Sequence, residues 1–95
     1  MIIVQDTFVC KPGNASKLAK LFKEVMGSRP EVVNIMTDMT GPFNRVVVVT
    51  RHDSLTAYEK SWENMSQEES QKMQEMMKGY TEMYQSGSRE IFQVW

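Results

Sequence analysis

The sequence contains one cysteine and one histidine among 95 residues. Cys10 therefore has no partner for an internal disulfide, and a metal site built from this chain alone is not expected; we expect no cofactor either. An excess of one charge is also missing: 11 Lys and Arg against 12 Asp and Glu give a net charge of −1. This balance excludes the basic surface that binds nucleic acid or anionic lipid.

Long apolar runs are absent as well. No run approaches the roughly 20 residues of a membrane-spanning helix, so we expect no membrane partner. The N-terminal segment, MIIVQDTF, lacks the basic region and cleavage site of a signal peptide, which favours a cytoplasmic location. With 41% hydrophobic and 24% charged residues, the chain is expected to form one folded domain spanning residues 1–95.

The first half of the chain predicts a strand, a helix and a hairpin. A β-branched run over 2–9 precedes the turn at 11–13, and Asn14 is a suitable N-cap for a helix that ends before Gly27. One face of this helix is apolar, with residues Ala15, Leu18, Ala19, Phe22, Val25 and Met26. Segments 32–40 and 45–52 then read as two strands of a hairpin.

The second half predicts helical structure and a closing strand. Ser54 is suited to cap one helix, and the capping box at 66–69 predicts a fresh helix start, although one bent helix is an alternative. Its stripe continues through Gly79, with residues Met73, Met76, Met77, Tyr80, Met83 and Tyr84, so the helix is expected to end at Gly87. Residues 88–95 form the predicted last strand.

This order, β-α-β-β-α(α)-β, predicts an α+β, ferredoxin-like sandwich. Its four-stranded antiparallel sheet carries the helices on one face. The other face should be polar at alternate positions, but Val46 to Val49 is continuously apolar, and Ile2–Ile3 and Ile91–Phe92 are apolar neighbours. We therefore expect a homodimer packed sheet face to sheet face, the alternative being a monomer that tolerates a small open face.

These elements, with the Lys11-Pro12-Gly13 turn and the stretch from Ala57-Tyr58 to Trp62, resemble the dimeric α/β-barrel superfamily. Its antibiotic-biosynthesis-monooxygenase-like and NIPSNAP-like branches are most similar, and the closing segment 88–94 resembles the second. The resemblance implies a face-to-face dimer with a pocket in each subunit between sheet and helices. It also implies a range of activities, from cofactor-free oxygenases to domains without known activity.

The haem-degrading branch of this superfamily uses an Asn on the first strand and a Trp and a His after the third strand. In this chain, the Asn position falls on Asp6. The Trp position falls on Ser61, so that Trp62 is one residue out of register, and the His position falls near Gln71 and Lys72. The missing histidine argues against haem degradation.

Three polar side chains are candidates for chemistry within the expected fold. His52 ends the third strand, where active-site groups often lie, although an exposed histidine is the alternative. Asp6 and Gln5 lie on opposite faces of the first strand, so one of them faces the helices and requires a partner, either a ligand or a structural hydrogen bond. The candidate catalytic residues are Asp6, His52 and Trp62.

Aromatic and methionine side chains on the later helices are candidates for a soft apolar pocket, unless they only pack the core. The candidate ligand-binding residues are Gln5, Tyr58, Trp62, Met73, Met77, Tyr80 and Tyr84. Cys10 follows the strand beside Lys11, a cation that favours the thiolate, but no base is adjacent in the sequence, so a nucleophilic role is not expected. Arg45, Arg51 and Arg89 are able to pair with an anionic ligand or to remain solvated.

The leading functional hypothesis is a small homodimeric domain that binds an apolar or aromatic molecule between sheet and helices. One alternative is a cofactor-independent oxygenase, which needs a base beside a dry pocket. The other is a structural or interaction domain with a filled core.

Overall fold

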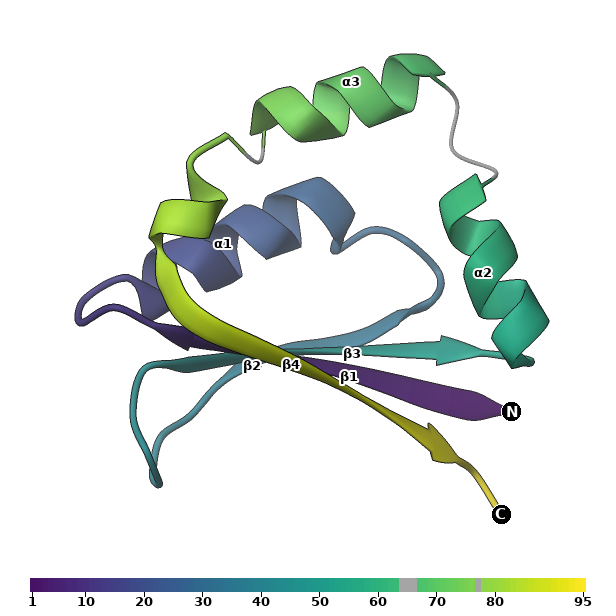
Figure 1. Cartoon of the computed structure of the whole chain (residues 1–95), viewed down its shortest axis with the longest axis horizontal. Coiled ribbons are helices and arrows are strands. Elements are labelled where there is room, and N and C mark those ends of the chain that lie inside the picture. The colour runs from purple at the N-terminus through teal and green to yellow at the C-terminus, as the bar shows by residue number, and fades with distance from the viewer. Residues whose placement is uncertain (64–66, 77) are drawn as a thin grey trace.

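The computed structural model describes residues 1–63, 67–76 and 78–95. A four-stranded antiparallel sheet forms one layer, and the helices form a second layer on one side of it (Figure 1). The elements in chain order are β1 (Ile2–Cys10), α1 (Ala15–Met26), β2 (Val32–Thr37), β3 (Arg45–His52), α2 (Leu55–Glu63), α3 (Gln67–Met76), the 3₁₀ turn η1 (Tyr80–Glu82) and β4 (Tyr84–Gln93). This arrangement confirms the predicted ferredoxin-like α+β fold.

The sheet order is β2-β3-β1-β4, so the two central strands are β1 and β3. The register pairs Asp6 of β1 with Val48 of β3 on one side and with Arg89 of β4 on the other. Alternation along each strand then assigns the side chains to faces. Even-numbered residues of β1 and β3 face the helices, and odd-numbered residues face the uncovered side.

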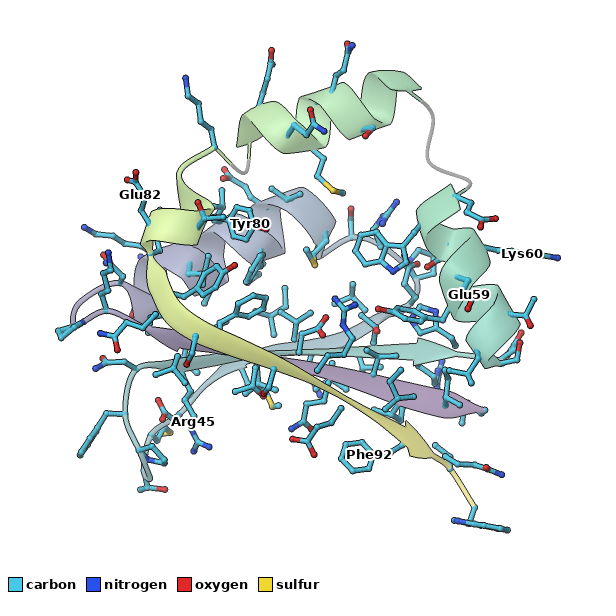
Figure 2. All side chains as sticks on the ribbon, viewed as in Figure 1. Arg45, Glu59, Lys60, Tyr80, Glu82 and Phe92 are labelled. Carbon is cyan, nitrogen blue, oxygen red and sulfur yellow. The ribbon has the colours of Figure 1, made fainter. Side chains whose placement is uncertain are left out.

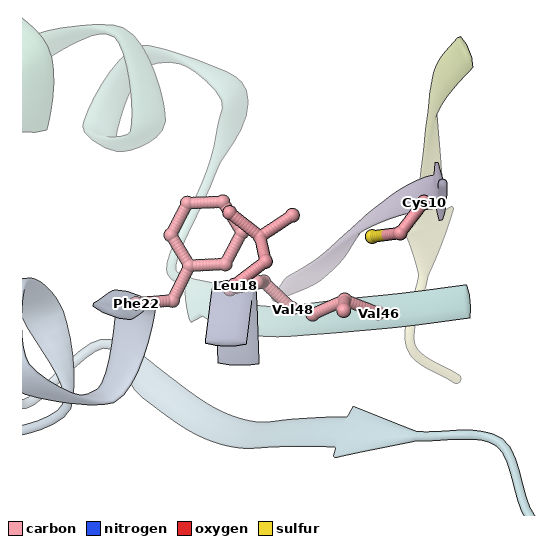
Figure 3. Close-up of a cluster of buried hydrophobic side chains, with 5 residues drawn as sticks. All are labelled: Cys10, Leu18, Phe22, Val46 and Val48. Atoms are coloured by element: carbon pink, nitrogen blue, oxygen red, sulfur yellow. The ribbon is translucent and has the colours of Figure 1, made fainter. Parts of the chain in front are cut away.

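The core lies between α1 and the central strands (Figure 3). Leu18 and Phe22 lie four residues apart on α1 and meet Val46 and Val48 from β3. Leu18 is 0% exposed. The apolar stripe of α1 thus buries the helix-facing half of the apolar run in β3, as the helical spacing predicted.

The helix after Asn14 begins where predicted, but Asn14 makes no side-chain capping hydrogen bond. Its carbonyl instead accepts the first helical hydrogen bond, from the Leu18 amide at 2.9 Å. Ser54 does cap α2, because its Oγ accepts a hydrogen bond from the Ala57 amide at 3.1 Å. The predicted cap at Ser66 lies outside the described residues.

The end of the last helix was predicted wrongly. The prediction extended helical structure to Gly87, whereas α3 ends at Met76 and the chain enters β4 at Tyr84. Gly79 explains the break, since its φ of +85° is left-handed and cannot continue an α-helix. Beyond it, Tyr84 pairs with Cys10, and Gly87 lies within the strand opposite Phe8.

The sheet face opposite the helices has no cover among the described residues. Figure 2 shows Arg45 and Phe92 on this side, with Tyr80 on the helix side. Phe92 and Met36 are 47% and 42% exposed. Val47 and Val49 of β3 lie between them and are half-buried. By the same alternation Gln5, Thr7 and Arg51 also lie on this face, so the predicted apolar side chains are present and open but are interspersed with polar ones.

Candidate functional site

A cavity of about 310 Å³ lies between the helix-facing side of the sheet and the helices. Its floor comes from β1, β3 and β4, and its walls come from α1, α2, α3, η1 and the segment before β2. The residues that line it are Asp6, Phe8, Phe22, Met26, Arg29, Glu31, Val32, Val48, Thr50, His52, Tyr58, Ser61, Trp62, Met73, Gln74, Tyr80 and Arg89. This volume is at the small end of the range for ligand pockets.

An ion pair between two neighbouring strands forms part of the floor. Arg89 donates from Nε to Oδ1 of Asp6 at 2.6 Å, across 83 residues of sequence. The Asp6 side chain is only 19% exposed, whereas that of Arg89 is 52% exposed and marks the opening of the cavity. This hydrogen bond raises the pKa of Arg89, against the opposing effect of burial, and the attraction of Asp6 and Tyr58 adds to it.

His52 closes the floor at the end of β3. Alternation places it on the helix side with Thr50, and its Nε2 lies 2.9 Å from Thr50 Oγ1. The residue is 9% exposed, so it is a buried histidine rather than a solvated strand end. Its ring meets the edge of Tyr58 at a centroid distance of 4.9 Å.

Helix α2 supplies an aromatic wall from two residues one turn apart. Tyr58 and Trp62 pack in a T-shaped contact at 6.4 Å, and Arg89 Cζ lies 5.8 Å from the centre of the Tyr58 ring. Ser61 is fixed between them, because its hydroxyl donates to the Tyr58 carbonyl at 2.6 Å. Trp62 is 52% exposed, which places it at the opening together with Arg89.

The hydroxyl of Tyr58 is buried and has no hydrogen-bond partner among the described residues. Buried polar atoms in proteins are nearly always satisfied, so each exception requires an explanation. The neighbouring polar groups make their hydrogen bonds elsewhere: Arg89 Nε bonds to Asp6, and His52 Nε2 bonds with Thr50. Tyr58 thus lines the cavity and carries a buried hydroxyl that the described residues do not satisfy.

The far end of the cavity is aromatic. The ring centroids of Phe8 and Phe22 lie 5.1 Å apart, and those of Phe22 and Tyr80 lie 6.4 Å apart. Tyr80 comes from the 3₁₀ turn that follows Gly79, so the early end of α3 is what brings it over the sheet (Figure 2). The cavity therefore runs from a charged opening to an apolar interior.

The structure brings most of the predicted site residues together. Those that line the cavity are Asp6, His52, Tyr58, Trp62, Met73 and Tyr80. Gln5 and Tyr84 do not line it: Gln5 lies on the open face of β1, and Tyr84 packs against Phe8 at 5.1 Å in the core. Met77 lies outside the described residues.

The surroundings of Cys10 do not favour a reactive thiolate. The side chain is 2% exposed and belongs to the core. Burial raises the pKa of the thiol, and the negative charge of Asp38 adds to this effect. The cation of Lys11, expected to favour the thiolate, is exposed and does not offset burial.

Sequence reasoning left Arg89 as one of three possible partners of an anion and did not identify Arg29 or Glu31. These last two form a 3.6 Å ion pair beside the cavity, just before β2. The predicted fold did contain a signal for Arg89, because a ferredoxin-like sheet places its last strand beside its first and thereby a cation near Asp6. Arg45 instead binds Asp38 at 3.0 Å, and Arg51 is exposed.

Across residues 1–63, 67–76 and 78–95, no three His, Cys, Asp or Glu side chains are grouped to hold a metal ion. Nor does this part of the chain contain a helix long and apolar enough to cross a membrane.

No protein-family model matches the sequence, and no curated protein is significantly similar to it. Solved structures do share its fold. An uncharacterised NIPSNAP-domain protein from Burkholderia xenovorans superposes with a TM-score of 0.80 at 12% identity, covering 100% of this chain and 95% of that one. A NIPSNAP-family protein from Agrobacterium tumefaciens gives 0.82 at 15% identity, covering 99% and 85%.

A third structure, from Nitrosomonas europaea, is described provisionally as an antibiotic biosynthesis monooxygenase. It has a TM-score of 0.70 at 9% identity and covers 99% of this chain and 98% of that one. The resemblance seen in the sequence is therefore confirmed at the level of the fold, which is that of NIPSNAP-domain and antibiotic-biosynthesis-monooxygenase-like proteins.

Proposed function

We propose that this chain binds a small aromatic molecule in the cavity between the sheet and the helices. The buried Tyr58 hydroxyl carries the proposal, because it lacks a partner among the described residues and belongs to a residue that lines the cavity of about 310 Å³. A ligand oxygen that enters the cavity would supply that partner. The unsatisfied hydroxyl would then destabilise the unliganded protein, and ligand binding would remove this free-energy penalty.

The composition of the cavity supports an aromatic ligand. Phe8, Phe22 and Tyr80 line its interior, and Trp62 lies half-exposed at its opening. Aromatic walls favour flat apolar ligands through stacked and edge-on contacts. Met73 adds a flexible side chain that adapts to ligand shape. A filled structural core is disfavoured by the cavity itself.

The domain acts, in this proposal, as a homodimer that packs its open sheet faces together. The support is a group of apolar side chains on the open face, where Phe92 and Met36 are half-exposed on either side of Val47 and Val49. A second copy would cover this face and leave each cavity on the outer, helix side. Val49→Glu should halve the mass measured by light scattering, whereas Thr56→Glu on the exposed side of α2 should leave it unchanged.

Isothermal titration calorimetry with 2-naphthol tests ligand binding. We expect saturable binding that Ser61→Trp abolishes, because an indole at this half-buried position fills the cavity. Ser16→Trp, at an exposed position of α1, is the matched control and should bind as the parent does. Absence of saturable binding up to millimolar concentration, or equal binding by both variants, would contradict the proposal.

A cofactor-independent oxygenase is the second candidate, favoured by the presence of Asp6, His52 and Trp62 around one cavity. Such an enzyme requires a base that removes a proton from an activated aromatic substrate, whose carbanion then reacts with oxygen. Oxygen uptake with a reduced polyphenol should fall in Asp6→Asn and His52→Gln. It should persist in Asp53→Asn, an exposed carboxylate beside His52. Unchanged rates in both cavity variants would remove these roles.

A further inference from the structure

The carboxylates that line the cavity have partners, but some of the hydrogen-bond donors there do not have one among the described residues. The two carboxylates are both matched, Asp6 by Arg89 at 2.6 Å and Glu31 by Arg29 at 3.6 Å. The donors are not all used. The Arg89 guanidinium carries five N–H groups and donates only from Nε to a described residue. The Tyr58 hydroxyl makes no hydrogen bond to a described residue.

The two residues that carry these donors are neighbours. Arg89 Cζ is 5.8 Å from the Tyr58 ring centre, and both residues line the same cavity. The paired Nε fixes the guanidinium plane against Asp6 and leaves the terminal nitrogens for another acceptor. A planar guanidinium presents such nitrogens as a fork that matches the two oxygens of a carboxylate.

The position of this donor pair indicates how a ligand would lie. Arg89 is 52% exposed at the opening, where Trp62 is also half-exposed, whereas Phe8 and Phe22 lie farther in. A charged group at the opening keeps part of its hydration, which limits the cost of desolvation. The attached ring would pass Trp62 into the aromatic interior.

We infer that the ligand is an aromatic carboxylic acid, whose carboxylate binds Arg89 and the Tyr58 hydroxyl while its ring system occupies the apolar part of the cavity. This inference rests on the proposed function, since it names the ligand class of the same site. Asp6 is a positioning residue for Arg89. One or two rings with a single carboxylate fit a cavity of about 310 Å³.

The test compares three ligands of nearly the same shape by calorimetry: 2-naphthoate, its neutral counterpart 2-naphthamide, and 2-naphthol. We expect the parent protein to bind the acid at least about tenfold more tightly than the amide. Arg89→Met should reduce this ratio to about one. Arg51→Met, the same change at an exposed arginine of β3, should leave the ratio unchanged.

Two further variants keep the test decisive if Arg89→Met does not fold, since that change leaves Asp6 without its partner. Arg89→Lys retains the charge but loses the fork, and should reduce the ratio several-fold. Tyr58→Phe should weaken the acid about threefold or more while leaving the protein folded. Circular dichroism of each variant establishes that it folds before binding is measured.

The outcomes distinguish failure of this inference from failure of the proposed function. Saturable binding of all three ligands with equal dissociation constants for acid and amide would overturn the aromatic-acid inference and leave the aromatic-binding function standing. Failure of all three to bind would remove both. An acid preference that survives in Arg89→Met would also overturn the inference, because the carboxylate would then bind elsewhere.

Discussion

Tyr58→Phe offers a direct test of whether the cavity wall is built for a ligand. The substitution removes one oxygen that is buried and has no partner among the described residues, and keeps the ring that packs against His52 and Trp62. An unsatisfied buried hydroxyl costs about 1–3 kcal/mol. We therefore expect the variant, without ligand, to be more stable than the parent by about 1 kcal/mol, at the lower end of that range because the cavity allows some relaxation.

For a chain of 95 residues, this change corresponds to an increase in Tm of about 4–8 °C. Urea unfolding followed by circular dichroism provides the free energy, and an unchanged dependence on urea would show that only stability changed. All samples require the same protein concentration, because a dimer links stability to concentration.

Tyr84→Phe is the matched control, since Tyr84 packs against Phe8 and Tyr80 in the core and does not line the cavity. Its stability should change by less than about 0.5 kcal/mol. A Tyr58→Phe variant that is less stable than the parent by more than this amount would refute the reasoning. The hydroxyl would then already have a partner in the unliganded protein.

Three other predictions concern the fold. Leu18→Ala should lower the free energy of unfolding, measured in urea, by about 2–5 kcal/mol, because Leu18 is 0% exposed. Leu55→Ala, at an exposed position, should change it by less than about 0.5 kcal/mol. Gly79→Ala should destabilise the protein by about 1–2 kcal/mol owing to its φ of +85°, even though no atom of a described residue lies within 4 Å of the added Cβ. Gly87→Ala should be close to neutral, and comparable losses in both variants would refute the role of φ. Burial raises the pKa of Asp38, but the hydrogen bonds and charge of Arg45 outweigh it and lower the pKa overall. The pair therefore stabilises the native state above the unfolded pKa of the carboxyl, and this effect is lost as the pH falls from that value through the lower native pKa. Asp38→Asn should therefore flatten the decline of Tm with acid, and an unchanged slope would contradict the assignment.

The order of elements could be predicted because hydrophobic periodicity and turn residues are local signals. The strand over 45–52 and the start of α1 at Ala15 follow from such patterns alone. The end of α3 could not be predicted in the same way. A helical stripe of Met and Tyr side chains continues across Gly79, and only the pairing of Tyr84 with Cys10 in the sheet assigns that residue to β4.

The candidate site was predictable in its residue types but not in its geometry. Both faces of β1 are apolar enough that its sequence did not decide between Asp6 and Gln5, and that choice follows from the packing of α1 on one side of the sheet. The contact between Asp6 and Arg89 spans 83 residues and depends on strand register. That no described residue bonds to the Tyr58 hydroxyl is a consequence of packing, which a single sequence does not reveal.

The central claim, that the cavity between sheet and helices binds an aromatic ligand, is tested most directly by locating a bound probe in solution. A ¹H–¹⁵N correlation spectrum recorded during a titration with 2-naphthoate would report on each backbone amide. The account predicts saturating shifts at cavity residues such as His52, Tyr58 and Arg89, with little change at Gln5 and Val49 on the open face. Shifts confined to the open face, or no saturating shifts, would contradict it.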